Sequence, residues 1–141
     1  MTDLTARLAP GIVHERRALQ FAIAIAGFVP VGAGLAGVVL GSTMLDDPIA
    51  SLSLDSHVRY LSGLLAGIGI ASWVLIPRIE TATALFRLIT FLVVIGGLAR
   101  FAGLFAVGVP SPPMLFGLAM ELVVTPLLCL WQARIAGLAA R

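Results

Sequence analysis

Four long runs of apolar residues, separated by short polar links, organise the chain. They cover about residues 18–40, 58–76, 83–107 and 113–132. A hydrocarbon core about 30 Å thick is crossed by roughly 20 helical residues, so each run is long enough to span a bilayer. None of the runs alternates apolar with polar residues, as the strands of a membrane barrel do. The pattern predicts one all-α integral membrane domain, a bundle of four transmembrane helices.

The first link carries signals for the start of a helix. Two aspartates followed by Pro48 are typical of a helix N-terminus and predict a short surface helix over residues 48–54. We expect Asp55 or Ser56 to cap the second span. The first apolar run is longer than the core of about 7–15 residues in a secretory signal, so we expect an uncleaved anchor.

Prolines inside the apolar runs predict bends. Pro30 interrupts the first run and Pro126 the fourth. Pro126 has no N–H, so it leaves the carbonyl of Leu122 without its helical donor. We expect Thr125 or a neighbouring helix to satisfy this carbonyl.

The arginines predict the orientation of the helices. All nine basic residues are arginine, and most lie in segments that four crossings place on one side of the membrane. These are Arg7, Arg16, Arg17, Arg78, Arg87, Arg134 and Arg141. Cytoplasmic segments collect such charges, so both termini are expected in the cytoplasm (N-in/C-in), with Trp73 and Trp131 near that interface. We expect Arg78, Glu80 and Arg87 to form a solvated charge group there.

The composition and charge of the chain exclude several classes of function. Apolar residues make up 60% of the chain and charged residues 11%, against about 45–50% and a quarter in soluble domains. A net charge of +2 is too small for a nucleic-acid partner. The one cysteine excludes an intrachain disulfide or cysteine metal cluster, and the two histidines fall on opposite sides of the membrane. We predict no cofactor, no metal and no enzymatic activity.

Small residues mark the predicted helix contacts, because close approach rather than hydrophobicity drives helix association in lipid. They are Gly37 and Gly41 in the first run, Gly63 and Gly67 in the second, Gly96, Gly97 and Gly103 in the third, and Gly117 in the fourth. Gly117, Glu121 and Thr125 follow one another at four-residue spacing and form one stripe. These faces are expected to look inward.

Arg100 and Glu121 are charged residues inside two successive runs. Alone at the bilayer centre, a charged side chain costs roughly 2.5–3.5 kcal/mol. Arg100 lies ten residues before Pro110 and Glu121 eight after Pro113, which places them about 15 Å and 12 Å from the outer helix ends. The two side chains are level across a helical hairpin, and we predict an ion pair between them.

A polar vestibule is predicted at the mouth of this pair. Asp55, His57, Arg59 and Tyr60 gather at the outer start of the second span. Together with the ion pair they could bind an anionic headgroup, pass a proton or hold a substrate carboxylate. The alternative, which we prefer on sequence grounds, is that the ion pair only locks two helices in register.

Several short motifs resemble a known family. They are Ser56-His57-Val58-Arg59-Tyr60-Leu61-Ser62-Gly63, Ile76-Pro77-Arg78-Ile79-Glu80, Gly96-Gly97-Leu98-Ala99-Arg100, Glu121-Leu122-Val123 and Leu130-Trp131-Gln132. Over about residues 19–136 this succession resembles the four-span bacterial proteins called domain of unknown function 4345, and more distantly DoxX-like membrane proteins. The resemblance implies a bacterial inner-membrane location and four helices, and it places Arg59, Arg100 and Glu121 at polar positions of the family pattern. It implies no activity.

Three functions remain open. The first is a non-enzymatic bundle that binds membrane lipids or a partner membrane protein, as a homodimer or with another chain. The second is a small dimeric transporter, coupled to protons or anions, in which Glu121 changes protonation against Arg100. The third, ranked last, is an enzyme acting on lipids, because the chain lacks a catalytic constellation.

Overall fold

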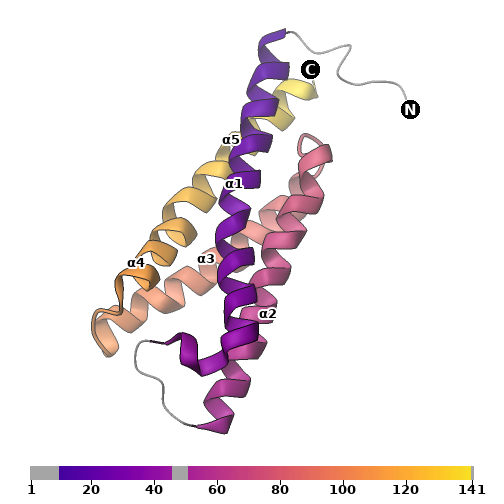
Figure 1. Cartoon of the computed structure of the whole chain (residues 1–141). Helices are drawn as coiled ribbons and strands as arrows, with labels where there is room; N and C mark the ends of the chain where they lie inside the picture. The colour runs from indigo at the N-terminus through magenta and orange to yellow at the C-terminus, as the bar shows by residue number, and fades with distance from the viewer. Residues whose placement is uncertain (1–9, 46–50, 141) are drawn as a thin grey trace. The chain divides into compact units, whose positions relative to one another are not determined.

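The structure, a computed structural model, describes residues 10–45 and 51–140. Over these residues the chain forms helices and turns and no strand. The first three crossings are α1 (Pro10–Leu40), α2 (Leu52–Leu75) and α3 (Thr83–Ala106), as Figure 1 shows. The last is built from α4 (Pro112–Ala119), a π-helical turn η4 (Met120–Val124) and α5 (Thr125–Ala139). Short 3-10 turns, η2 (Gly41–Met44) and η3 (Ile76–Arg78), follow α1 and α2.

Four helical segments are long and apolar enough to cross a membrane. They are Gly11–Met44, Leu52–Arg78, Thr83–Ala106 and Pro112–Ala139. This confirms the predicted all-α, four-span fold class. The side of the membrane on which the helix ends lie stays a prediction.

The start of α2 differs from the expectation. The helix begins at Leu52, and Ser51 caps it: the Ser51 hydroxyl accepts a hydrogen bond from the amide of Leu54 at 3.4 Å. The predicted cap by Asp55 or Ser56 is wrong, because both residues already lie within the helix. The two aspartates and Pro48 at residues 46–48 lie outside the described residues, as do Arg7 and Arg141.

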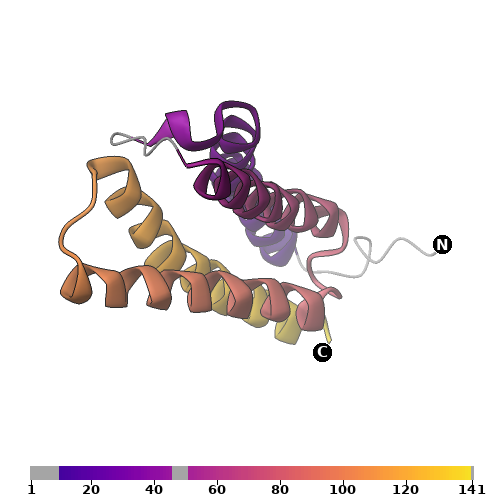
Figure 2. The same cartoon turned by 90° about the horizontal axis from the view of Figure 1, so that it is seen from below.

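The chain divides into two compact units. Unit 1 comprises Met1–Ala24 and Leu75–Arg141, and unit 2 comprises Ile25–Val74. In unit 1, α3 runs alongside the α4–η4–α5 crossing (Figure 2). The buried core of unit 1 consists of Leu19, Ile23, Ile79, Phe86 and Ile135. It therefore joins the first part of α1, the link between α2 and α3, and the two following crossings.

Away from this core, large apolar side chains lie on the surface. Phe105 on α3 is 80% exposed and Leu130 on α5 is 68% exposed. A soluble protein rarely exposes so many large apolar side chains, whereas lipid acyl chains cover them without cost. The exposed surface agrees with a membrane location.

In unit 2, α1 and α2 approach closely where α1 carries glycine. A Cβ built on Gly34 would lie 2.5 Å from the backbone nitrogen of Ala66 and 2.6 Å from the carbonyl oxygen of Ser62. A Cβ on Gly37 would collide with the Ser62 hydroxyl. The same contact face continues on α2 at Gly69, where a Cβ would lie 2.6 Å from Val31 Cγ2.

The α2 face in this contact is not the predicted one. A Cβ on Gly63 would be 3.9 Å from its nearest neighbour, and nothing lies within 4 Å of one on Gly67. Each follows a contact residue, Ser62 or Ala66, by one position. One residue along a helix turns the side chain by about 100°, which turns Gly63 and Gly67 away from the closest approach of the two helices.

Gly34→Ala should destabilise the protein, whereas Gly67→Ala should not. At Gly34 the added methyl meets backbone atoms that cannot move aside, and we expect the free energy of unfolding to fall by about 1–3 kcal/mol. At Gly67 there is space, and alanine is the better helix former by up to about 1 kcal/mol. Denaturant titration in mixed micelles measures both. Equal losses would contradict the assigned contact face.

Candidate functional site

Arg100 on α3 and Glu121 on η4 form the predicted ion pair. Arg100 Nε donates to Glu121 Oε2 at 3.1 Å, and Nη2 donates to Oε1 at 3.2 Å. Both carboxylate oxygens are therefore engaged by one edge of the guanidinium, the bidentate arrangement that arginine favours. The pair lies within unit 1.

A glycine one turn before Arg100 lets the two helices come this close. A Cβ on Gly97 would lie 2.8 Å from Leu122 Cδ2 and 2.9 Å from Glu121 Cβ. The other glycines predicted for these faces make no such approach, since nothing lies within 4 Å of a Cβ on Gly96, Gly103 or Gly117. Of the predicted small residues on α3 and the last crossing, only Gly97 makes the contact.

The turn that carries Glu121 is π-helical. Pro126 cannot donate to the Leu122 carbonyl, and the preceding turn contains one extra residue. The amide of Thr125 donates to the Met120 carbonyl, and the Thr125 hydroxyl donates to the same oxygen at 2.9 Å. Thr125 was expected to donate to the Leu122 carbonyl. This is wrong, because Thr125 donates to the Met120 carbonyl instead. Turns of this type occur frequently at functional sites in other proteins.

Arg100 is not enclosed by its partner. Its side chain is 34% exposed and that of Glu121 is 16% exposed. The remaining contact is between Nη1 and the Met114 sulfur at 3.2 Å, a weak acceptor. Because a guanidinium carries more N–H groups than these contacts use, Arg100 retains donor capacity.

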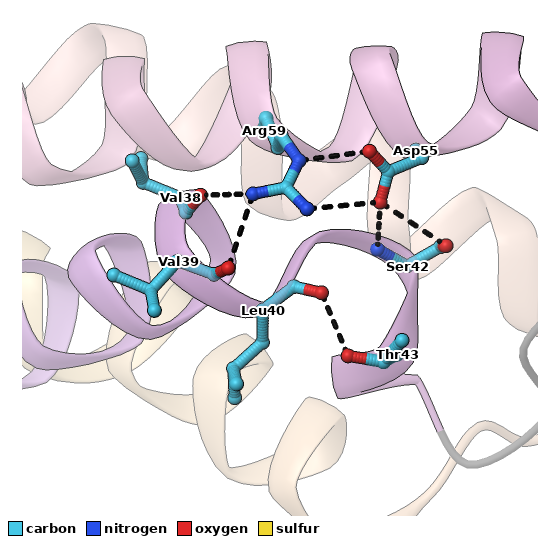
Figure 3. Close-up of polar contacts among 7 residues, drawn as sticks. All are labelled: Val38, Val39, Leu40, Ser42, Thr43, Asp55 and Arg59. Carbon is cyan, nitrogen blue, oxygen red and sulfur yellow. Dashed lines mark hydrogen bonds and ion pairs between the residues drawn. The ribbon is translucent and has the colours of Figure 1, made fainter.

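A second ion pair, Asp55–Arg59, lies in unit 2 and caps the end of α1 (Figure 3). Arg59 Nη1 donates to the carbonyls of Val38 at 2.6 Å and Val39 at 3.1 Å. These carbonyls belong to the last turn of α1, where no helical donor follows and where a cation is favoured. Arg59 Nε in turn donates to Asp55 Oδ2 at 2.8 Å.

The turn after α1 contacts the Asp55 carboxylate of this pair. Asp55 Oδ1 accepts hydrogen bonds from the amide and the hydroxyl of Ser42 at 2.9 and 3.3 Å. Gly41 has a positive φ of 61°, and a Cβ there would collide with the Asp55 carboxylate. The capping of the α1 end therefore explains the positions of both Asp55 and Arg59.

His57 and Tyr60 are not part of this arrangement. Both are exposed, and His57 lies two residues from Asp55, on a different face of α2. The structure brings Asp55 and Arg59 together, and it brings Arg100 and Glu121 together, but in different units. The vestibule that would join all of these residues stays a prediction.

A polar cluster that the sequence analysis missed lies at the α2–α3 link of unit 1. Arg16 Nε donates to Glu80 Oε2 at 2.8 Å, and the Glu80 side chain is only 9% exposed. Arg16 Nη2 also donates to the Pro77 carbonyl at 2.9 Å, and Gln20 Nε2 donates to the Ile76 carbonyl at 2.8 Å.

The expectation of a solvated group is wrong for Glu80, whereas Arg78 and Arg87 are exposed. The signal for this partly buried cluster was the helix end at Pro77, which leaves carbonyls in need of donors.

A comparison with protein families finds the family that the sequence motifs resemble. The family described as a domain of unknown function, DUF4345, matches residues 18–132. The chain belongs to this family. Its description assigns no activity, so the molecule is a multi-pass membrane protein of a family whose function is unknown. No curated protein and no solved structure matches the chain.

Removing both partners of the Arg100–Glu121 pair should be less harmful than removing one. Arg100→Leu or Glu121→Leu leaves the other charge unpaired, and we expect each to lower the free energy of unfolding by about 2 kcal/mol. This is less than for a fully enclosed pair, because the Arg100 side chain is 34% exposed. The double variant should recover most of that loss. Denaturant titration in mixed micelles checks the cycle. Additive losses would contradict an energetic coupling between the two side chains.

Arg59→Gln should lower the thermal unfolding midpoint, because it removes the cationic donor from the α1 carbonyls. His57→Gln is the control: it lies on the same helix, is exposed, and should leave the midpoint unchanged. Thermal unfolding in detergent compares the two. Equal midpoints would contradict the capping role.

Proposed function

We propose that this protein is a non-enzymatic membrane protein that binds phospholipid, with Arg100 contacting the headgroup phosphate. The observation that carries this proposal is that Arg100 has different hydrogen-bond acceptors from Arg16 and Arg59. Arg16 and Arg59 each donate to main-chain carbonyls at a helix end, which accounts for their positions. Among the described residues Arg100 donates to no carbonyl; it contacts only Glu121 and the Met114 sulfur. Capping therefore does not account for Arg100.

The depth of Arg100 suits a headgroup. The structure ends α3 at Ala106, earlier than the sequence estimate counted from Pro110. Arg100 lies six residues before that end, about 9 Å along the helix axis rather than about 15 Å. A long arginine side chain at this depth can extend toward the interface, and its planar guanidinium matches phosphate oxygens. Exposed apolar side chains on the same helix, such as Leu98 and Phe101, would lie along the acyl chains.

Glu121 would position the guanidinium rather than contact the lipid. It holds one edge through both carboxylate oxygens and leaves the rest for a ligand. The proposed setting is the bacterial inner membrane, with both termini in the cytoplasm. The transporter alternative requires Glu121 to release Arg100 during each cycle, and no observed contact favours that exchange over a fixed pair.

Lipid retention tests the proposal. The wild type purified from membranes rich in phosphatidylglycerol should keep bound phospholipid in native mass spectrometry, and the Arg100→Leu/Glu121→Leu variant should lose most of it. The loss of one bidentate charged contact predicts about a tenfold or larger reduction in retention. Arg134→Gln is the control, because it removes an exposed arginine that pairs with Glu15 at the other end of unit 1.

Equal retention by all three proteins would overturn the proposal. Proton flux into proteoliposomes that is abolished by Glu121→Gln would favour the transporter instead.

A further inference from the structure

Gln132 on α5 is a polar side chain with no exposed surface. Its amide nitrogen Nε2 donates to the Ile79 carbonyl at 2.8 Å and to Thr83 Oγ1 at 2.9 Å. Because the Ile79 carbonyl can only accept, a flipped carboxamide would place two acceptor oxygens against each other. The orientation of the side-chain amide is therefore fixed, and its oxygen Oε1 is hydrogen-bonded to neither partner.

This oxygen lacks a donor. Gln132 Oε1 is buried and accepts no hydrogen bond from any described residue. Folded proteins leave few buried polar atoms unsatisfied, and where protein donors are missing an ordered water is the common partner. The requirement is stricter in a membrane-spanning bundle, because surrounding lipid offers no alternative.

The start of α3, next to Gln132, has amide groups that lack an acceptor. α3 begins at Thr83, whose hydroxyl is the atom that Gln132 contacts. The residue before it, Ala82, has no side-chain oxygen, and no side chain caps the helix. The first amides of α3 therefore require an acceptor. Water can donate to Oε1 and accept from an amide at once.

We infer that a single buried water molecule binds between Gln132 Oε1 and the first turn of α3. It donates to Gln132 Oε1 and accepts from one amide in the first turn of α3. The site takes water rather than a larger ligand, because Gln132 is entirely enclosed. This inference is independent of phospholipid binding at Arg100.

Radiolytic labelling in oxygen-18 water tests the inference on the wild type in lipid nanodiscs. Radicals generated from a bound water oxidise adjacent side chains even when bulk solvent cannot reach them. Ile79 and Ile135 are 0% exposed, and Ile23 in the same core, at 2%, is the control of the same residue type. We expect several-fold more label on Ile79 or Ile135 than on Ile23. Labelling no greater than that of Ile23 would overturn the inference.

Gln132→Met tests whether the side-chain oxygen holds the water, since it keeps the length of the side chain and removes its polar atoms. The excess label should fall to the level of Ile23, and persistence of the excess would overturn the assignment. A second measurement needs no variant. Magnetisation should pass from water to the side-chain amide protons of Gln132 in the wild type, and its absence would equally overturn the site.

Discussion

The need of every polar group for an internal partner shapes this protein more than any apolar contact. Hydrocarbon supplies no hydrogen bonds, so helix ends and charged side chains must be satisfied by the chain itself. The structure meets this need at two helix ends in the same way. Arg59 donates to the last carbonyls of α1, and Arg16 donates to the Pro77 carbonyl after α2. A carboxylate then holds each arginine: Asp55 for the first and Glu80 for the second.

Backbone approach at glycine provides the second organising contact. Within unit 2, Gly34 allows α1 to touch the backbone of α2, and within unit 1 Gly97 allows η4 to reach α3. Gly34 approaches backbone atoms of α2, whereas Gly97 approaches the side chains of Leu122 and Glu121. Both positions agree with the role of small residues as contact points between helices in lipid. In unit 1 the approach at Gly97 has a chemical consequence, because it places the Glu121 carboxylate beside the Arg100 guanidinium.

Arg100 differs from Arg16 and Arg59 in the donor groups that it leaves free. The Arg16 and Arg59 guanidiniums are each occupied by a carboxylate and by main-chain oxygens, which gives them a structural purpose. Arg100 has one carboxylate, one weak sulfur contact and partial exposure on an apolar helix. Its position next to a π-helical turn adds a local backbone feature that a plain helix lock does not require. These features are the basis for the proposal that Arg100 contacts a phospholipid headgroup.

The sequence by itself determined the helical class, the four crossings and the Arg100–Glu121 pair. Long apolar runs admit few alternatives, and two charges at matched depth on successive helices have a strong energetic reason to meet. Only the tertiary structure decided which glycines are contacts, because Ser62 and Gly63 differ by one position and composition does not show which faces a neighbour. It likewise decided that the partly buried Glu80 pairs with Arg16 and that Gln132 donates to the Ile79 carbonyl. These partners lie more than fifty residues apart, and no local pattern encodes such a pairing.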